Sequence, residues 1–137
     1  MVLIVDATDR VMGRLSAIVA KKLLEGETVT VVNAGQCVIS GNAEFIKRKY
    51  LAKKHRGSRQ KGPFIHRGPD ALFRRCVRGM VPRKKYKGRE AYGRLKVFSK
   101  CPEDFKDLKK FGKCATDLQC KFLRLKEVSK FLGSKVE

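Results

Sequence analysis

The sequence predicts one α/β domain over residues 1–137, with a three-layer α/β/α architecture around a mainly parallel four-stranded sheet. The first hundred residues alternate short apolar runs with segments of helical periodicity. The runs are continuously apolar rather than alternating, which is typical of parallel strands buried on both faces. Right-handed crossovers between such strands would place helices on both faces of the sheet. We expect a core over about residues 1–99 and a short C-terminal extension over about residues 100–137.

The expected strands are apolar runs of three to five residues. The second run, Thr28–Val32, is β-branched throughout, which favours a strand. The other three are shorter and are also bounded by polar or turn-forming residues. The four expected strands are residues 3–5, 28–32, 36–39 and 95–98.

The first expected helix repeats apolar residues at helical spacing from Met12 to Leu23. Asp9 is a suitable N-cap for it, because a short carboxylate accepts from the free N–H groups of a first turn. Gly26 is its expected end.

A second helix is expected after the turn Ser40-Gly41-Asn42, which can cap its start. Its lysines and arginines would point outward. Its inward residues would be the apolar ones, namely Phe45, Ile46, Tyr50 and Leu51.

A third helix is expected to open at Pro69 and to stop before Pro82, since proline is tolerated only in a first turn. Apolar residues from Leu72 to Met80 form one face of it. A short helix around residues 90–94 follows. In the extension, the apolar clusters at residues 122–125 and 128–132 predict a strand and then a short amphipathic helix packed on the core.

Positive charge is concentrated in one stretch of the chain. The net charge is +20, and the stretch from Lys53 to Lys100 holds 17 lysines and arginines against only Asp70 and Glu90. A patch this dense repels itself unless an anionic partner neutralises it. Nucleic acid, bound with release of counterions, is the partner that this composition favours.

Two basic loops, residues 55–68 and 83–89, bracket the third helix, whose Arg74, Arg75 and Arg78 share one side. Arginine matches phosphate oxygens with a planar fork, and lysine adds point charge. Phe64, Tyr86 and Tyr92 lie among these charges and could stack on unpaired bases. Structured helices mixed with basic loops favour folded RNA over DNA groove reading, since no helix-turn-helix or zinc-finger spacing is present.

We expect the RNA contacts to come from these two loops, the helix between them and the start of the first helix. The residues are Arg10, Arg14, Lys53, Lys54, His55, Arg56, Arg59, Lys61, His66, Arg67, Arg74, Arg75, Arg78, Gly79, Arg83, Lys84, Lys85, Lys87, Arg89 and Arg94. Valine in place of Gly79 is expected to harm the backbone path itself.

Other function classes have weaker support in the sequence. An enzyme would use Asp6, His55 or His66, but no Gly-x-Gly-x-x-Gly or P-loop motif is present, and Asp6 with Asp9 reads as a turn or cap pair. A general RNA chaperone would bind unrelated RNAs equally. A protein of anionic lipid surfaces would need an amphipathic helix with spare apolar residues or a lipid anchor.

The five cysteines are an odd, scattered set, which does not indicate a disulfide framework. Structural zinc sites show paired, closely spaced ligands, so a site at Cys101, Cys114 and Cys120 is the weaker interpretation. We expect free thiols, no metal and no cofactor. The longest early apolar run, Val2–Val5, is too short for a signal-peptide core or a spanning helix.

Several blocks of the sequence resemble the L-thirteen family of universal large-subunit ribosomal proteins. The N-terminal blocks are Val5-Asp6-Ala7, Met12-Gly13-Arg14-Leu15, Val31-Val32-Asn33-Ala34 and Val38-Ile39-Ser40-Gly41-Asn42. The more specific blocks are Arg74-Arg75 with Arg78-Gly79-Met80-Val81-Pro82, and Gly88-Arg89-Glu90-Ala91-Tyr92. The ending, from Lys121-Phe122 to Leu132-Gly133, looks like the archaeal and eukaryotic branch.

The resemblance implies a structural constituent of the large ribosomal subunit with no catalytic activity. Its partners would be large-subunit ribosomal RNA and neighbouring large-subunit proteins, with no membrane and no small-molecule substrate. Its location would be the cytoplasmic ribosome, and the nucleolus during assembly if the source is eukaryotic. Family positions carried over as RNA contacts are Arg74, Arg75, Arg78, Gly79, Lys84, Lys85 and Arg89.

Overall fold

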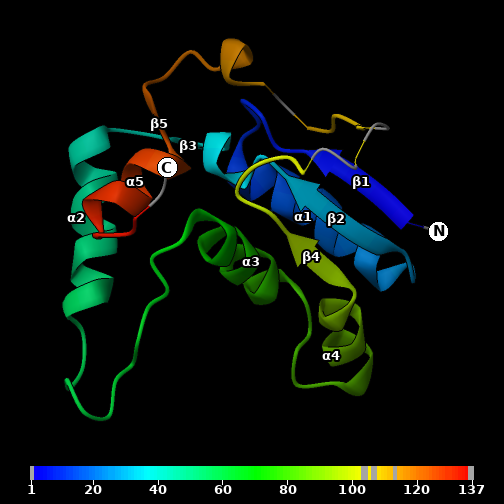
Figure 1. Ribbon diagram of the computed structural model, residues 1–137, viewed down its shortest axis with the longest axis horizontal. Helices are drawn as coiled ribbons and strands as arrows, with labels where there is room; N and C mark the ends of the chain where they lie inside the picture. Colours follow the sequence, from blue (N-terminus) through cyan, green and yellow to red (C-terminus); the bar gives the residue numbers. More distant parts are fainter. Residues whose placement is uncertain (1, 103–104, 106–107, 113, 136–137) are drawn as a thin grey trace.

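The computed structural model describes residues 2–102, 105, 108–112 and 114–135 (Figure 1). Its strands are β1 Val2–Asp6, β2 Thr28–Val32, β3 Val38–Ser40, β4 Leu95–Val97 and β5 Phe122–Arg124. Its α-helices are α1 Met12–Leu24, α2 Ala43–His55, α3 Pro69–Met80, α4 Tyr86–Gly93 and α5 Leu125–Phe131. Two short 3-10 helices are η1 Ala34–Gln36 and η2 Ala115–Asp117.

The main sheet is parallel, and its strand order is β1-β2-β4. Val31 of β2 is paired with Val5 on one side and with Val97 on the other. The expected fourth strand is not part of this sheet, since β3 pairs antiparallel with β5 instead. Only residues 33–37 separate β2 from β3, and a parallel neighbour requires a crossover of a dozen residues or more.

The helices α1, α3 and α4 pack on one face of the main sheet. Leu3, Val29 and Leu95 are paired across the three strands and belong to one core cluster with residues of these helices. On the alternate positions, Val2 and Lys96 of the outer strands are exposed, whereas Thr30 and Val32 of the central strand are buried. Among the described helices, the three that pack on the main sheet therefore share one face of it, and the expectation of helices on both faces is not confirmed. The strand order advances in one direction, so each right-handed crossover returns over the same face.

A second packed group lies beside the main sheet and contains β3, β5, α2 and α5. Figure 1 shows α2 and α5 next to each other, and α5 also packs on η1 and α3. The expected C-terminal strand and amphipathic helix are confirmed, with Leu125, Val128 and Leu132 fully buried. The C-terminal segment thus completes the small sheet and covers one end of the core.

The helix starts agree with the sequence at α2 and α3 but not at α1. The side chain of Asn42 accepts a hydrogen bond from the Glu44 N–H at 3.0 Å, and Pro69 is in the first turn of α3. Val11, not Asp9, is the N-cap residue of α1. Asp9 instead has a left-handed φ of 51°, and its carboxylate accepts from Arg124 of β5 at 3.1 Å.

One apolar residue of α2 was expected inside but lies outside. Phe45 is 66% exposed, whereas Ile46 is buried. Because α2 contacts mainly α5 and β5, only a narrow stripe of the helix is covered.

Among the described helices, none is both long enough and apolar enough to cross a membrane.

Candidate nucleic-acid interface

Helix α3 is amphipathic, with one side buried in the core and a basic side exposed to solvent. Leu72, Phe73 and Val77 are buried, while Arg74 and Arg75 are exposed on the opposite side. The guanidinium carbon of Arg74 lies 5.0 Å from the centre of the Tyr92 ring, so α4 supports this arginine through a cation–π contact. A planar cation held in this way loses less freedom when it binds a phosphate.

The second basic loop runs from Pro82 into α4. Lys84, Lys85 and Lys87 are exposed along it, and Tyr86 exposes 74% of its surface between them. Gly88 is buried, and a Cβ there would collide with the carbonyl oxygen of Pro82. This close approach of two backbone segments keeps the lysines on one short turn.

The first basic loop spans residues 56–68 in the structure, because His55, which was expected in the loop, is the last residue of α2. Both ends of the loop are held by α5 and its C-cap residue Leu132. The Nζ of Lys54 donates to the carbonyl oxygen of Leu132 at 3.1 Å. At the other end, the hydroxyl of Ser129 donates to the carbonyl oxygen of Arg67. We call these two hydrogen bonds the α5 clamp. Sequence reasoning missed it, because partners 78 and 62 residues apart leave no local signal.

The tip of this loop is a small backbone hairpin. Ser58 and Gly62 exchange two hydrogen bonds of 3.0 and 2.9 Å. A Cβ on Gly57 would clash with the carbonyl oxygen of Gly62, and Gly57 also has a φ of +91°, so glycine is required there. The loop encloses a groove of about 530 Å³, which we call the loop groove. Its walls are Lys54, His55, Arg56, Gly57, Ser58, Arg59, Pro63, Phe64, Ile65 and Arg67.

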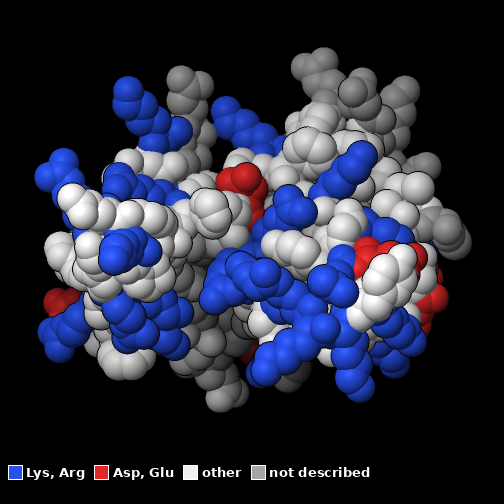
Figure 2. Space-filling view, turned by 90° about the horizontal axis from the view of Figure 1, so that it is seen from below, with Lys and Arg blue, Asp and Glu red and all other residues white. Residues whose placement is uncertain are grey.

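Helices α3 and α4 and the first basic loop lie along the lower side of the molecule in Figure 1. Figure 2 views this side directly and shows lysine and arginine side chains over much of it, with few acidic ones. The lysines and arginines that are close together in the sequence therefore also gather on one side of the folded molecule. Such a surface creates a positive potential that attracts and orients a polyanion.

Most of the expected contact residues are exposed. These are Arg14, Lys53, His55, Arg56, Arg59, Lys61, His66, Arg67, Arg74, Arg75, Gly79, Arg83, Lys84, Lys85, Lys87 and Arg89. The other four, Arg10, Lys54, Arg78 and Arg94, are half-buried.

Two of the half-buried arginines are bonded to the protein itself. Arg94 pairs with Glu90 at 2.9 Å and donates to the carbonyl oxygen of Leu23 at 2.9 Å, which ties the end of α4 to the end of α1. Arg10 donates to the carbonyl oxygen of Gly112 at 2.8 Å. These guanidinium groups stabilise the fold, and they are less available to a phosphate than Arg74 or Arg75.

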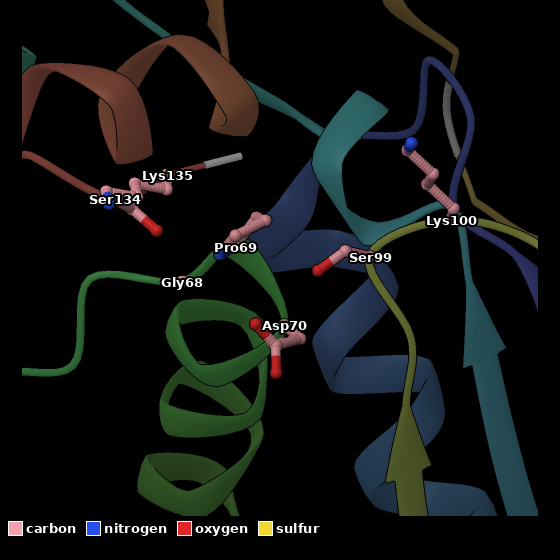
Figure 3. A pocket seen from close by; sticks show the side chains of 7 residues that line it. All are labelled: Gly68, Pro69, Asp70, Ser99, Lys100, Ser134 and Lys135. Carbon is pink, nitrogen blue, oxygen red and sulfur yellow. The ribbon is translucent and has the colours of Figure 1, made fainter. Parts of the chain in front are cut away.

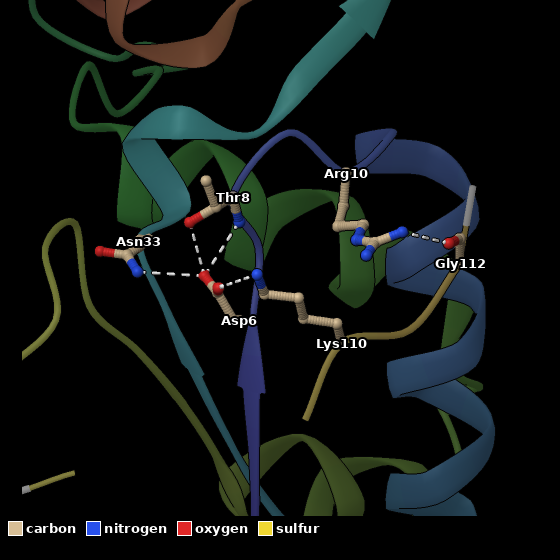
Figure 4. A network of polar contacts seen from close by, with 6 residues as sticks. All are labelled: Asp6, Thr8, Arg10, Asn33, Lys110 and Gly112. Atoms are coloured by element: carbon tan, nitrogen blue, oxygen red, sulfur yellow. Dashed lines mark hydrogen bonds and ion pairs between the residues drawn. The ribbon is translucent and has the colours of Figure 1, made fainter. Parts of the chain in front are cut away.

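Asp6 is the centre of a structural network rather than a catalytic group (Figure 4). Its Oδ1 accepts from the N–H and the hydroxyl of Thr8, at 3.0 and 2.6 Å, and from the Nδ2 of Asn33 at 3.0 Å. Burial by itself would raise the pKa of Asp6, but these hydrogen bonds and the nearby Lys110 outweigh it and lower the pKa. The turn interpretation of Asp6 is confirmed.

The buried Cys37 thiol and the hollow at the start of α3 do not have the features of a second functional centre. Burial raises the pKa of the Cys37 thiol to about 12, and no group of three metal-ligating side chains occurs in the part of the chain that the structure describes. A hollow of about 470 Å³ at the start of α3 is lined by residues that include Asp70, Ser99 and Lys100 (Figure 3). The Asp70 carboxylate already lies where the N-terminal end of the helix dipole would favour an anion.

Gly79 has no steric reason to be a glycine. A Cβ at this exposed position of α3 would meet nothing within 4 Å, which gives no steric support to the expectation that valine would harm the backbone path. A glycine inside a helix costs about 0.5–1 kcal/mol relative to alanine. The glycine leaves the surface of α3 without a side chain at this position, between Arg75 and Arg78 of the basic side and the end of the helix.

Comparison with known proteins places the chain in a family of ribosomal proteins, which is consistent with a basic surface. The family described as Ribosomal protein L13 matches residues 1–104, which is well over half of the chain. The chain belongs to the ribosomal protein L13 family. The match includes both basic loops and helix α3, and it excludes β5 and α5.

Archaeal relatives extend the similarity of this L13 family member beyond residue 104. "Large ribosomal subunit protein uL13" of Archaeoglobus fulgidus is 42% identical over 136 residues, covering 95% of this chain and 86% of the relative. The protein of the same name from Thermoplasma acidophilum is 42% identical over 132 residues, covering 95% and 97%. That from Methanosarcina barkeri is 38% identical and covers 96% and 98%. The resemblance to the L13 family is thus confirmed.

Proposed function

We propose that this protein is a structural constituent of the large ribosomal subunit that binds and stabilises folded ribosomal RNA. Membership of the ribosomal protein L13 family carries the proposal, and the relatives are named as large-subunit proteins. The family is one of ribosomal proteins and not of enzymes, which agrees with the expectation of no catalytic activity. The partners would be ribosomal RNA and neighbouring large-subunit proteins.

The basic surface supplies the physical mechanism for this role. Exposed cations on α3, α4 and both loops would neutralise closely spaced phosphates, and the packed core would hold them at fixed separations. Release of counterions from the RNA supplies much of the affinity, and the fixed geometry supplies selectivity for one RNA shape. We infer that the exposed residues of the expected set make these contacts, and that residues 1–137 act as one domain.

Sedimentation of a cell extract through a gradient tests the proposal. We expect this protein to migrate with large subunits and to remain there after a high-salt wash, because an integral protein has contacts beyond surface charge. Release at a few hundred millimolar salt would instead indicate a loosely held factor. Absence from the subunit fractions would reject the ribosomal role and favour an enzyme or a general RNA chaperone.

A further inference from the structure

We propose that the loop groove receives one unpaired nucleotide of the bound RNA, with its base stacked on Phe64 and its phosphates held by the surrounding arginines. This inference rests on the proposed function and deepens it by naming the RNA feature that the site takes. Three properties of the groove support it, namely an open aromatic ring, a lining rich in cations and a frame that the protein holds in place.

The aromatic ring is exposed, and one side of it lies against the backbone. Phe64 exposes 74% of its surface, although an apolar ring gains nothing from contact with water. Its Cδ2 and Cε2 lie 3.1 and 3.2 Å from the point where a Cβ on Gly62 would stand, so the ring rests against the Gly62 backbone. One side of the ring is thus supported while the rest stays open. An open aromatic surface of this kind is what an unpaired base stacks on.

The lining of the groove favours an anionic ligand. Arg56, Arg59 and Arg67 contribute to it together with Lys54 and His55, and no lining residue is acidic. Its volume of about 530 Å³ lies within the range of pockets that enclose small organic ligands. The hollow at the start of α3 differs in this respect, because Asp70 lines it and would repel a phosphate.

The frame of the groove is preformed by hydrogen bonds within the protein. The Ser58–Gly62 hairpin fixes the tip of the loop, and the α5 clamp fixes its two ends at Lys54 and Arg67. A preformed site loses less conformational entropy when its ligand enters. A base inside a duplex is already stacked on its neighbours and cannot reach the ring, so the occupant is an unpaired nucleotide.

Ultraviolet cross-linking of the full chain to purified large-subunit ribosomal RNA tests this assignment. We expect a peptide containing Phe64 to be joined to a single nucleotide. That nucleotide should react with base-modifying reagents in free RNA and be protected in the complex. Phe64→Ala should abolish this protection and weaken binding roughly 5- to 150-fold, the range expected for the loss of one stacked base. Phe64→Trp should retain both properties.

Phe45→Ala is the matched control, because Phe45 is also an exposed phenylalanine but lies on α2 outside the groove. It should leave binding and protection unchanged. If Phe64→Ala binds within about twofold of the wild type with the same protection pattern, the inference is wrong and the proposed function stands. A cross-linked nucleotide that is base-paired in the complex also overturns it. If the wild type does not bind the RNA at all, both proposals fail.

Discussion

At the scale of single residues, the Asp6 carboxylate makes stability depend on pH. Its folded pKa lies below the ordinary 3.8, so its contribution is present above about pH 4 and is lost as the pH falls through the lowered pKa. Asp6→Asn cannot ionise and lacks this contribution. We expect it to cost about 1–3 kcal/mol at neutral pH and to flatten the acid limb of the stability curve.

Urea unfolding at a series of pH values between about 2 and 7 measures this effect. Glu127→Gln, which removes an exposed carboxylate, serves as the control and should leave the curve close to that of the wild type. An Asp6→Asn protein that loses stability in acid as steeply as the wild type would show that other carboxylates dominate.

Two glycines of the basic surface should respond in opposite ways to alanine. Gly79→Ala fills open space in α3 and should raise the free energy of unfolding by about 0.5–1 kcal/mol while weakening RNA binding. Gly88→Ala places a methyl group against the Pro82 carbonyl and should lower the free energy of unfolding by about 1–3 kcal/mol. Thermal unfolding and filter binding of ribosomal RNA measure the two effects. Equal stability of the two variants would contradict the difference between the open space at Gly79 and the close backbone contact at Gly88.

At the scale of elements, Arg75 on α3 and Arg94 after α4 form a matched pair of arginines. Arg75→Ala should weaken RNA binding and leave thermal unfolding nearly unchanged, since its side chain is exposed. Arg94→Ala should lower stability by about 1–3 kcal/mol, because the carbonyl of Leu23 and the carboxylate of Glu90 lose their common donor. Equal losses of binding and stability in Arg75→Ala would mean that this arginine is structural.

The individual elements could be predicted because their signals are local. Thr28–Val32 is a strand as expected, and the starts of α2 and α3 follow from Asn42 and Pro69. The placement of β3 was not predicted correctly, because its partner β5 lies more than eighty residues later in the chain. The crossover length between β2 and β3 was the available signal, since residues 33–37 are too few for a parallel return.

The composition of the candidate site could also be predicted, because its signals are local, but the partners of its side chains could not. Charge and aromatic residues in the two loops are visible in the sequence, and the exposure of Arg56, Arg75 and Phe64 agrees with it. The difference between the exposed Arg75 and the internally bonded Arg94 could not be read from composition. This difference depends on tertiary partners such as the carbonyl oxygen of Leu23, 71 residues from Arg94.

At the scale of the whole molecule, the surface charge predicts a steep dependence of RNA affinity on salt. A protein that contacts about 6–10 phosphates loses roughly a thousandfold or more in affinity between about 50 and 200 mM salt. We expect this range for the full chain bound to large-subunit ribosomal RNA. Single substitutions such as Arg59→Ala or Lys84→Ala should each reduce the slope of log K against log salt by about one.

Filter binding across a salt series measures these slopes. Lys21→Ala is a suitable control, because Lys21 is an exposed lysine in the last turn of α1 and outside both loops. A slope near zero for the wild type would show that charge neutralisation contributes little and would favour binding by shape and stacking alone.

The α5 clamp also has a consequence for the timing of synthesis. Ser129 follows Arg67 by 62 residues, so at about 5–20 residues per second the loop is made roughly 3–12 seconds before its anchor. During that interval, a strongly cationic segment exists without the helix that holds its ends. Translation of α5 therefore sets the time at which the nascent chain acquires a defined surface for RNA. A chain interrupted before α5 would carry the positive charge of the first basic loop without the hydrogen bonds that hold the ends of this loop.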